Sequence, residues 1–265
     1  MTPALVLRNL RHQRRMILAT AAGLVAFETL LTWASAQVER NAGLRALVQI
    51  LPPAVQDMLA SQLAYVSFPG AVAFGFGHPV ALAASISFVI VAATTPVAEL
   101  ETGFLDLVLA RPVPRRGYLV ASLASVALGS LIAPAALLAG AALGLSLVDL
   151  PSELPWTRYA RSAVELGALL LGLGGCSMLL GAGAKRRGTA IGRAVGFTLG
   201  SFFLDFLAQL RSEIRWAQYL SPFHYFRPVP AAITPELPLV SLIALGGLFL
   251  VTTAIAFVVF ERRDI

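Results

Sequence analysis

The stretch YLVASLASVALGSLIAPAALLAGAALGLSLV, residues 118–148, contains no charged side chain. A helix needs about 20 apolar residues to cross the hydrocarbon core of a bilayer, so this stretch is longer than one crossing requires. Pro134 lies near its middle, and proline kinks a helix because it has no backbone N–H. We therefore predict one kinked or steeply tilted transmembrane helix here, not two separate spans.

Further apolar windows of spanning length occur along the rest of the chain. Together they predict six spans, at about 16–36, 78–98, 118–148, 160–184, 194–210 and 237–260. Of the 265 residues, 57% are hydrophobic and 13% are charged, whereas about 25% are charged in soluble domains. This composition argues against a cytosolic enzyme and leaves too little polar sequence for a second, soluble domain. The predicted fold is a single all-α integral membrane domain over residues 1–265.

The basic residues predict the orientation of the spans. Most of the 20 Lys and Arg fall in residues 8–15, 111–116, 185–193 and 262–263. By the positive-inside rule these segments are cytoplasmic, as are both termini. Topology thus explains the net charge of +6 better than nucleic-acid binding does, and we expect a multi-pass protein of the bacterial cytoplasmic (inner) membrane.

The N-terminal segment is also compatible with a signal peptide, because Arg14 and Arg15 precede an apolar run that ends in small residues at 34–36. The run is longer than a usual signal-peptide core, however, and Glu28 interrupts it. We therefore expect a retained first span. The arginine-rich residues before it, 1–15, are predicted to form a cytoplasmic amphipathic helix at the membrane interface.

Two longer outer loops separate the spans. The first, about 37–77, contains Pro52 and Pro53 followed by residues 54–66, which we predict to form a short helix on the membrane surface. The last, about 211–236, carries aromatic residues among arginines, a composition suited to the lipid headgroup region. We expect this segment to be interfacial or re-entrant, with outer-gate candidates Tyr219, Phe223, His224 and Tyr225.

Motifs for chemistry within the chain are missing from the sequence. Lys185, the only lysine, is followed by Arg186, so there is no Gly-Lys-Ser/Thr loop for a nucleotide phosphate. The three histidines lie in separate segments, and Cys176 is the only cysteine. We predict no metal site, no internal disulfide and no enzymatic activity in this chain.

The most informative segment lies between the second and third spans and reads ELETGFLDLVLARPVPR, residues 99–115. Acidic residues at its start suit the N-terminus of a helix. Leu105, Val108 and Leu109 form an apolar stripe at helical spacing before Pro112 ends the pattern. A cytoplasmic amphipathic helix is therefore predicted, and its stripe must be covered by a partner or by lipid.

This segment resembles the corresponding part of the permease subunits of type-2 ABC transporters. Phe104 departs from the threonine that is usual in the family, and residues 221–225 (SPFHY) and 261–264 (ERRD) add to the resemblance. The positions that match the family pattern are Glu99, Glu101, Gly103, Leu105, Asp106, Leu109, Pro112, Val113 and Arg115.

The resemblance implies that residues 99–115 are a coupling helix that docks into a separate cytoplasmic ABC ATPase subunit, present in two copies. ATP and Mg would be bound by that partner, and this chain would hold no cofactor. The family also implies two permeases whose first and fifth spans meet. A homodimer is the favoured arrangement, with a sister permease as the alternative.

The fifth span has two distinct faces. Gly192, Gly196 and Gly200 repeat every four residues, which gives a face that permits close backbone contact with another helix. We expect this face to pack in a dimer, or alternatively within one protomer. Thr198, Ser201, Asp205 and Gln209 form a polar face on the opposite side.

Three acidic residues are predicted in the outer half of the membrane. A carboxylate at the centre of a spanning helix costs about 2.5 to 3.5 kcal/mol on insertion scales, so such residues should face protein, water or cations. They could instead pair with arginines, Glu165 with Arg161, and Asp205 or Glu28 with Arg211. The candidates for a translocation pathway are Glu28, Thr32, Glu165, Thr198, Ser201 and Asp205.

The sequence thus favours the transmembrane subunit of an ATP-driven exporter. Its apolar spans suit an amphipathic or hydrophobic substrate such as a drug, an antibiotic or a lipid. An ABC exporter of an ion is the alternative within the family. Outside it, the alternatives are a secondary transporter driven by an ion gradient through the three acids, and a membrane scaffold that does not transport.

Overall fold

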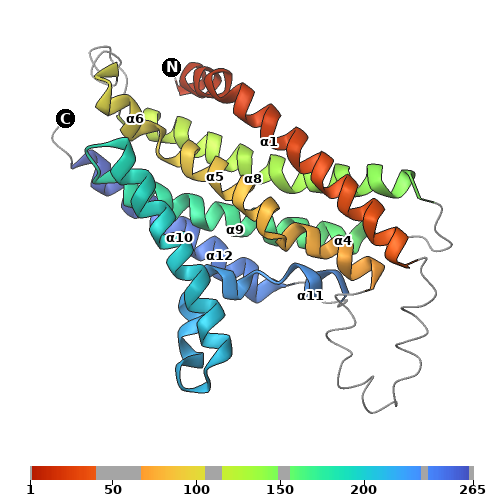
Figure 1. The fold of residues 1–265 in the computed structure, drawn as a ribbon. Helices are drawn as coiled ribbons and strands as arrows, with labels where there is room; N and C mark the ends of the chain where they lie inside the picture. Colours follow the sequence, from red (N-terminus) through yellow and green to blue (C-terminus); the bar gives the residue numbers. More distant parts are fainter. Residues whose placement is uncertain (1, 40–66, 105–114, 149–155, 234–237, 263–265) are drawn as a thin grey trace.

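The computed structural model describes residues 2–39, 67–104, 115–148, 156–233 and 238–262 (Figure 1). These residues are mostly helical and include no strand. In chain order the helices are α1 (Thr2–Glu39), α4 (Phe68–Gly77), α5 (Pro79–Ala93), α6 (Thr95–Glu101), α8 (Arg115–Ser146), α9 (Trp156–Ala182), α10 (Arg187–Leu210), η1 (Ser212–Leu220), η2 (Pro222–Tyr225), α11 (Pro228–Ile233) and α12 (Leu239–Glu261).

Within the described ranges, six stretches of helix are long and apolar enough to cross a membrane, which confirms the predicted number and order of spans. They are Ala4–Gln37, Phe68–Ala93, Arg116–Ser146, Trp156–Ala182, Arg187–Leu210 and Leu239–Glu261. The third is one helix with Pro134 inside it, as the sequence predicted, and not two.

Two predicted boundaries were wrong. The second span begins at Phe68, not near residue 78, because the Ser67 hydroxyl caps α4 (3.2 Å from the Gly70 nitrogen) and Pro79 starts α5 directly after His78. Glycine and proline in this stretch resemble a loop in sequence. The fifth span begins at Arg187, not near 194, because the arginines of its first turns lower the local hydropathy.

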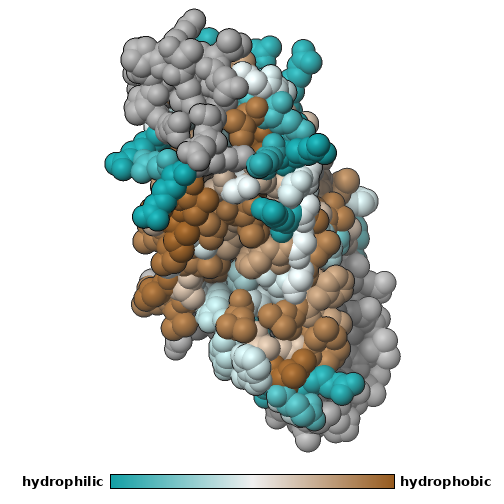
Figure 2. Space-filling model, turned by 90° about the vertical axis from the view of Figure 1, so that its left-hand side faces the viewer, coloured by the Kyte–Doolittle hydropathy of each residue, from teal (hydrophilic) through white to brown (hydrophobic). Residues whose placement is uncertain are grey.

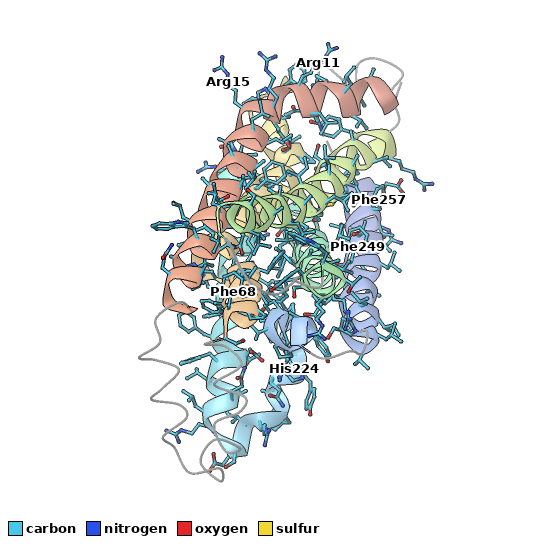
Figure 3. The ribbon with its side chains drawn as sticks, turned by 90° about the vertical axis from the view of Figure 1, so that its right-hand side faces the viewer. Arg11, Arg15, Phe68, His224, Phe249 and Phe257 are labelled. Atoms are coloured by element: carbon cyan, nitrogen blue, oxygen red, sulfur yellow. The ribbon has the colours of Figure 1, made fainter. Side chains whose placement is uncertain are left out.

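The start of α1, α6 and the end of α12 lie at one end of the bundle, which we call the terminal end (Figure 1). The opposite end, with η1 and α11, is the far end. Residues 2–15 are not a separate helix, because α1 runs without a break from Thr2 to Glu39. It bends near Arg15, and its first turns cross the terminal end with Arg11 and Arg15 pointing away from the bundle (Figure 3).

The core forms where spans approach closely. The main pairings are α1 along α8 and α12 along α9. At the first of these, an added Cβ on Gly140 would lie 2.6 Å from the carbonyl oxygen of Val25, so the two backbones are nearly in contact. Leu24, Leu137 and Leu166, each at most 2% exposed, fill the space around them.

The helix α10 is the exception, because its far-end half projects from the bundle (Figure 1). Leu199, Phe203 and Leu207 on it are about half exposed, at 52%, 55% and 49%. On the face of the molecule that Figure 2 presents, apolar residues cover much of the middle while hydrophilic residues gather toward the two ends. This pattern suits a protein that crosses a bilayer.

Candidate functional site

At the terminal end, α6 is held by α1. Arg8 of α1 forms an ion pair with Glu99, and its guanidinium carbon lies 4.7 Å from the centre of the Phe104 ring. One turn further along α1, the Gln13 amide donates to the Thr95 hydroxyl at 3.2 Å. The N-terminal turns of α1 therefore fix both ends of α6.

The same short helix is also joined to α10. Glu101 accepts a hydrogen bond from the backbone N–H of Arg187 at 2.7 Å. Arg187 is the first residue of α10, and the first N–H groups of a helix have no partner within it. The Glu101 carboxylate therefore caps α10 and complements the positive end of its dipole.

Glu99 and Glu101 do not lie at the N-terminus of a helix, as the sequence predicted, because both residues lie at the end of α6; their role in coupling stays a prediction. The helix ends there because Gly103 adopts a φ of 70°, a left-handed conformation that favours glycine, after Thr102 as the C-cap. Carboxylates at a helix C-terminus oppose its dipole, and Arg8 and the N–H of Arg187 supply the compensating positive groups.

Most of the predicted coupling helix lies outside the described residues. This applies to Leu105, Asp106, Leu109, Pro112 and Val113. Of the remaining matched positions, Gly103 forms the turn after α6, and Arg115 begins α8. The described part of the segment borders a cavity of about 470 Å³ that also touches His12 and Arg187.

In the far half of the bundle, the three acids occupy separate environments. Glu28 of α1 is fully buried, and neither of its carboxylate oxygens has a hydrogen-bond partner among the described residues. Its carboxylate lies where a side chain on Gly75 would be, 1.9 Å from the position of an added Cβ. Thr32, one turn along α1, is also fully buried and packs against Gly144 of α8.

Glu165 of α9 binds the chain that returns to the bundle after α10. Its Oε2 accepts the backbone N–H of Arg227 at 3.0 Å. One turn earlier on α9, the Ser162 hydroxyl donates to the carbonyl of Pro228 at 2.7 Å. These two bonds hold the start of α11 on α9, so the described partner of Glu165 is a backbone amide and not the predicted Arg161.

Asp205 of α10 is 9% exposed and faces the aromatic residues of η2. Its Oδ2 accepts a hydrogen bond of 2.6 Å from Gln209, and Oδ1 lies 3.7 Å from the Nδ1 of His224. These are its described polar neighbours, in place of the predicted Arg211. Thr198 and Ser201 lie on the same buried face of α10, and the Ser201 carbonyl accepts the Ser221 hydroxyl at 2.8 Å.

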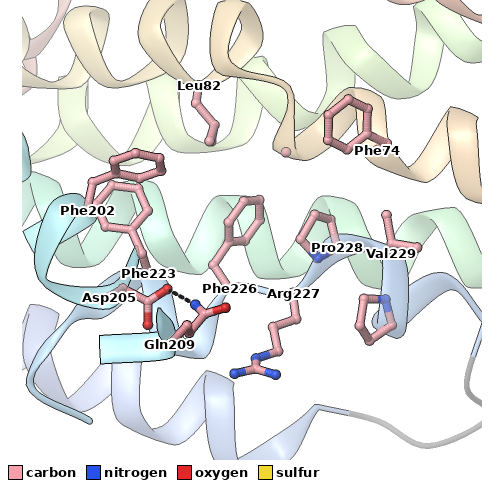
Figure 4. Close-up of a pocket in the computed structure, with 12 residues that line it drawn as sticks. Phe74, Leu82, Phe202, Asp205, Gln209, Phe223, Phe226, Arg227, Pro228 and Val229 are labelled. Carbon is pink, nitrogen blue, oxygen red and sulfur yellow. Dashed lines mark hydrogen bonds between the residues drawn. The ribbon is translucent and has the colours of Figure 1, made fainter. Parts of the chain in front are cut away.

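A cavity of about 270 Å³ lies beside Asp205, between α10 and the α4–α5 junction (Figure 4). Asp205 and Gln209 stand at one side of it, while Leu82 and Phe74 lie across from the returning chain. Its lining residues include Phe74, Leu82, Phe202, Asp205, Gln209, Phe223, Phe226 and Arg227. Aromatic side chains thus share the lining of this cavity with polar groups, a combination that suits an amphipathic small molecule.

His224 is close to this carboxylate without neutralising it. Burial lowers the pKa of His224 below its usual value, and the nearby Arg227 guanidinium acts in the same direction, while Asp205 acts against them. The imidazole is therefore neutral at neutral pH. Arg227 itself donates to the His224 carbonyl at 3.2 Å.

The outer-gate candidates divide into two groups. Tyr219, His224 and Tyr225 lie together, with ring centres 4.8 and 5.1 Å apart around His224. Phe223 instead packs edge-on against Phe202, 5.5 Å away, at the wall of the cavity. The segment after α10 thus folds back into the bundle through η2 and α11.

The dimer-packing candidates face away from the described chain. Among the described residues, and apart from the backbone of α10 itself, no atom lies within 4 Å of an added Cβ on Gly192, Gly196 or Gly200. Within this part of the chain the three glycines therefore pack against no other helix, and their contact in a dimer stays a prediction. The face they form, which we call the glycine face, is open.

Sequence reasoning missed the part that Arg227, Phe74 and Phe226 play in the far half. The backbone N–H of Arg227 is a partner of Glu165, and all three residues line the cavity. Phe74 was assigned to an outer loop because the start of the second span was misplaced. The hydrogen bond from the backbone N–H of Arg227 to Glu165 cannot be predicted from the sequence, because every residue other than proline has such a group.

The described residues include six helices that are long and apolar enough to span a membrane, with buried polar residues among them, as in a multi-pass membrane protein. The comparison of sequences agrees with this class. Residues 5–260 match the family described as the C-terminal domain of the multidrug efflux system permease Rv1217c. The chain belongs to this family, and is thus a permease by family. A comparison with curated proteins gave no match.

Proposed function

We propose that the chain is the transmembrane subunit of an ATP-driven exporter and works with a separate ATPase. The substrate is an amphipathic or hydrophobic compound that leaves the cell across the bacterial inner membrane, and both termini are cytoplasmic. The family description, a multidrug efflux permease, supports export of this kind of compound. The terminal end of the bundle is then the cytoplasmic end.

The observation that carries this proposal is the attachment of α6 to two different helices. Glu99 is paired with Arg8 of α1, and Glu101 caps the first turn of α10. A partner that pushes on residues 99–115 would therefore move α1 and α10 together. That is what a coupling segment has to do if it transmits the closure of an ATPase to the membrane domain.

The helix α10 connects this end to the cavity in the far half. Its first residue is bound by Glu101, and about five turns later its polar face carries Asp205 at the cavity wall. An α-helix rises about 1.5 Å per residue and is stiff over this length. A displacement at its cytoplasmic end would thus change the cavity without any flexible connection between them.

Pairing with a second permease follows from the same proposal. The glycine face of α10 is open, and α1 is covered over only 17% of its most apolar window. The family is that of one domain of a permease, which fits a chain that supplies half of a transporter. We place the partner on α1 and α10, and a second copy of this chain is the simplest candidate.

Copurification tests the ATPase partner. The tagged chain, solubilised in detergent from its native membranes, is expected to bring down a Walker-containing ATPase. A Glu101→Arg, Leu105→Asp double variant is expected to lose about tenfold or more of that ATPase, because it removes the cap of α10 and breaks the apolar stripe.

The matched control makes the same changes at the far end, Glu213→Arg with Leu220→Asp on exposed positions of η1. It should retain the ATPase, and the melting temperature of all three proteins should agree within a few degrees. Capture of no ATPase by the wild-type chain, or equal capture by the double variant, would overturn the proposal.

A second candidate function, transport driven by an ion gradient, is favoured by Glu28. A carboxylate that is fully buried, with no hydrogen-bond partner for either oxygen in the described part of the chain, is unusual in structural roles and common at ion-coupling positions. Replacement by the isosteric amide, Glu28→Gln, separates the two functions. Under ATP-driven export, efflux from cells should persist at more than about half its rate, whereas a gradient-driven carrier that uses Glu28 should lose it almost completely.

A further inference from the structure

The residues that line the cavity beside Asp205 favour one class of amphipathic compound. The inference drawn from them rests on the proposed export function. The walls of the cavity combine aromatic and aliphatic side chains from α4, α5, α10 and η2 with polar groups of Asp205, Gln209 and Arg227. Phe202 and Phe223 meet edge to face, 5.5 Å apart, next to the carboxylate. Aromatic faces carry partial negative charge, so a group of rings around one carboxylate attracts cations.

The Asp205 carboxylate is free to accept such a ligand. Asp205 is nine-tenths buried, and its Oδ1 has no hydrogen-bond partner among the described residues. Its nearest basic group is His224 Nδ1 at 3.7 Å, which is neutral at neutral pH for the reasons given above. The Nη2 of Arg227 lies 3.4 Å from the same Nδ1 of His224. A buried carboxylate that forms no direct ion pair with Arg or Lys among the described residues is costly, and a bound cation would relieve that cost.

Arg227 lines the same cavity but is engaged elsewhere. Its Nε donates to the carbonyl of His224 at 3.2 Å, and the guanidinium points away from the rings of Phe223 and Phe226 (Figure 4). Its backbone N–H is bound to Glu165. Arg227 therefore presents its backbone and the base of its side chain to the cavity, while its positive charge lies at the margin.

We propose that this cavity is a binding site for a small amphipathic organic cation. The ammonium group lies at the Asp205 carboxylate, which lines the cavity, and the apolar part of the ligand packs between Phe74, Phe223 and Phe226. A cavity of about 270 Å³ is near the lower limit of the roughly 300–1,000 Å³ of small-molecule sites, so the ligand is the size of one aromatic ring with a substituted amine.

Binding to the purified chain tests this site without any ATPase. The probe is benzyltrimethylammonium, titrated at pH 7.5 by calorimetry into the detergent-solubilised protein, with phenylacetate as an anion of similar size. The wild-type chain is expected to bind the cation at least about tenfold more tightly than the anion, because only the cation forms a favourable charge contact with Asp205. Equal affinities, or tighter binding of phenylacetate at Arg227, would overturn the proposal.

Variants locate the site. Asp205→Asn is expected to weaken binding of the cation about tenfold or more, whereas Glu213→Gln, which removes an exposed acid from the neighbouring η1, should leave it unchanged. Because Asp205→Asn alters a buried position, Phe202→Leu gives a second reading. Phe202 is 43% exposed, so its replacement should preserve the fold. It should still lower the affinity for the cation several-fold, because one aromatic face is lost from the site. Unchanged affinity in both folded variants would overturn the site.

The outcome is independent of the proposed coupling. If the cation binds as described and no ATPase copurifies, the site stands and the ATP-driven function fails. If an ATPase copurifies and the cation does not bind, the exporter stands and its substrate is of another chemical class.

Discussion

Replacement of Gly140 by leucine is expected to lower the free energy of unfolding of the chain by about 3 kcal/mol or more. An added Cβ at this position would lie 2.6 Å from the Val25 carbonyl oxygen and 2.8 Å from the Cβ of Glu28. The first of these atoms belongs to the backbone of α1, so no side-chain rotation can make room. The two helices would have to separate along their main contact.

The measurement is the melting temperature and the fraction of monodisperse protein after solubilisation in a mild detergent. Gly247→Leu on α12 is the matched control, because no atom lies within 4 Å of an added Cβ there. It should keep or slightly raise stability, since leucine is the better helix former by up to about 1 kcal/mol. Equal melting temperatures for the two variants would contradict the close approach of α1 and α8.

The second large effect is expected from a substitution on the glycine face, and it concerns the pairing of two protomers. Gly196→Leu places a branched side chain in the middle of the glycine face, where no described atom outside α10 lies within 4 Å of an added Cβ. Each protomer should therefore keep its melting temperature. A second helix that packs closely on this face would be displaced, because small residues set the approach distance of such pairs.

Cross-linking in native membranes, followed by mass determination in detergent, measures this effect. The wild-type chain should be captured mainly as a dimer, and the Gly196→Leu variant as a monomer, with at least about a tenfold change in the ratio. The Gly247→Leu variant again serves as control. A dimer that survives Gly196→Leu would move the interface away from the glycine face of α10.

The spans were predictable because the hydrophobic requirement of a bilayer acts on local composition. A spanning helix can be recognised from an uncharged stretch such as 118–148 without knowledge of the rest of the chain. Errors occurred where local composition is ambiguous. The stretch around Gly77 and Pro79 has the residues of a loop, but it is the junction of two successive helices. The first of them is capped at Ser67 and ends at Gly77, and the second begins at Pro79.

The site was predicted less completely than the fold. Helical periodicity placed Asp205 on a buried polar face, and glycine spacing found the open face of α10. Periodicity within one helix cannot say which residue of another helix lies opposite, so the contacts Glu165–Arg227 and Glu101–Arg187 were missed. Both involve backbone N–H groups, which carry no residue-specific signal.

The central claim is that ATP, and not an ion gradient, drives export through this chain. It is tested most directly in inside-out membrane vesicles from cells that express the chain together with the proposed ATPase, with uptake of radiolabelled benzyltrimethylammonium as the measure. ATP is expected to drive uptake in the presence of valinomycin and nigericin, which together collapse the ion gradients. The Glu101→Arg, Leu105→Asp variant should abolish this uptake. Uptake that follows an imposed proton gradient without ATP, and that the ionophores abolish, would contradict the account.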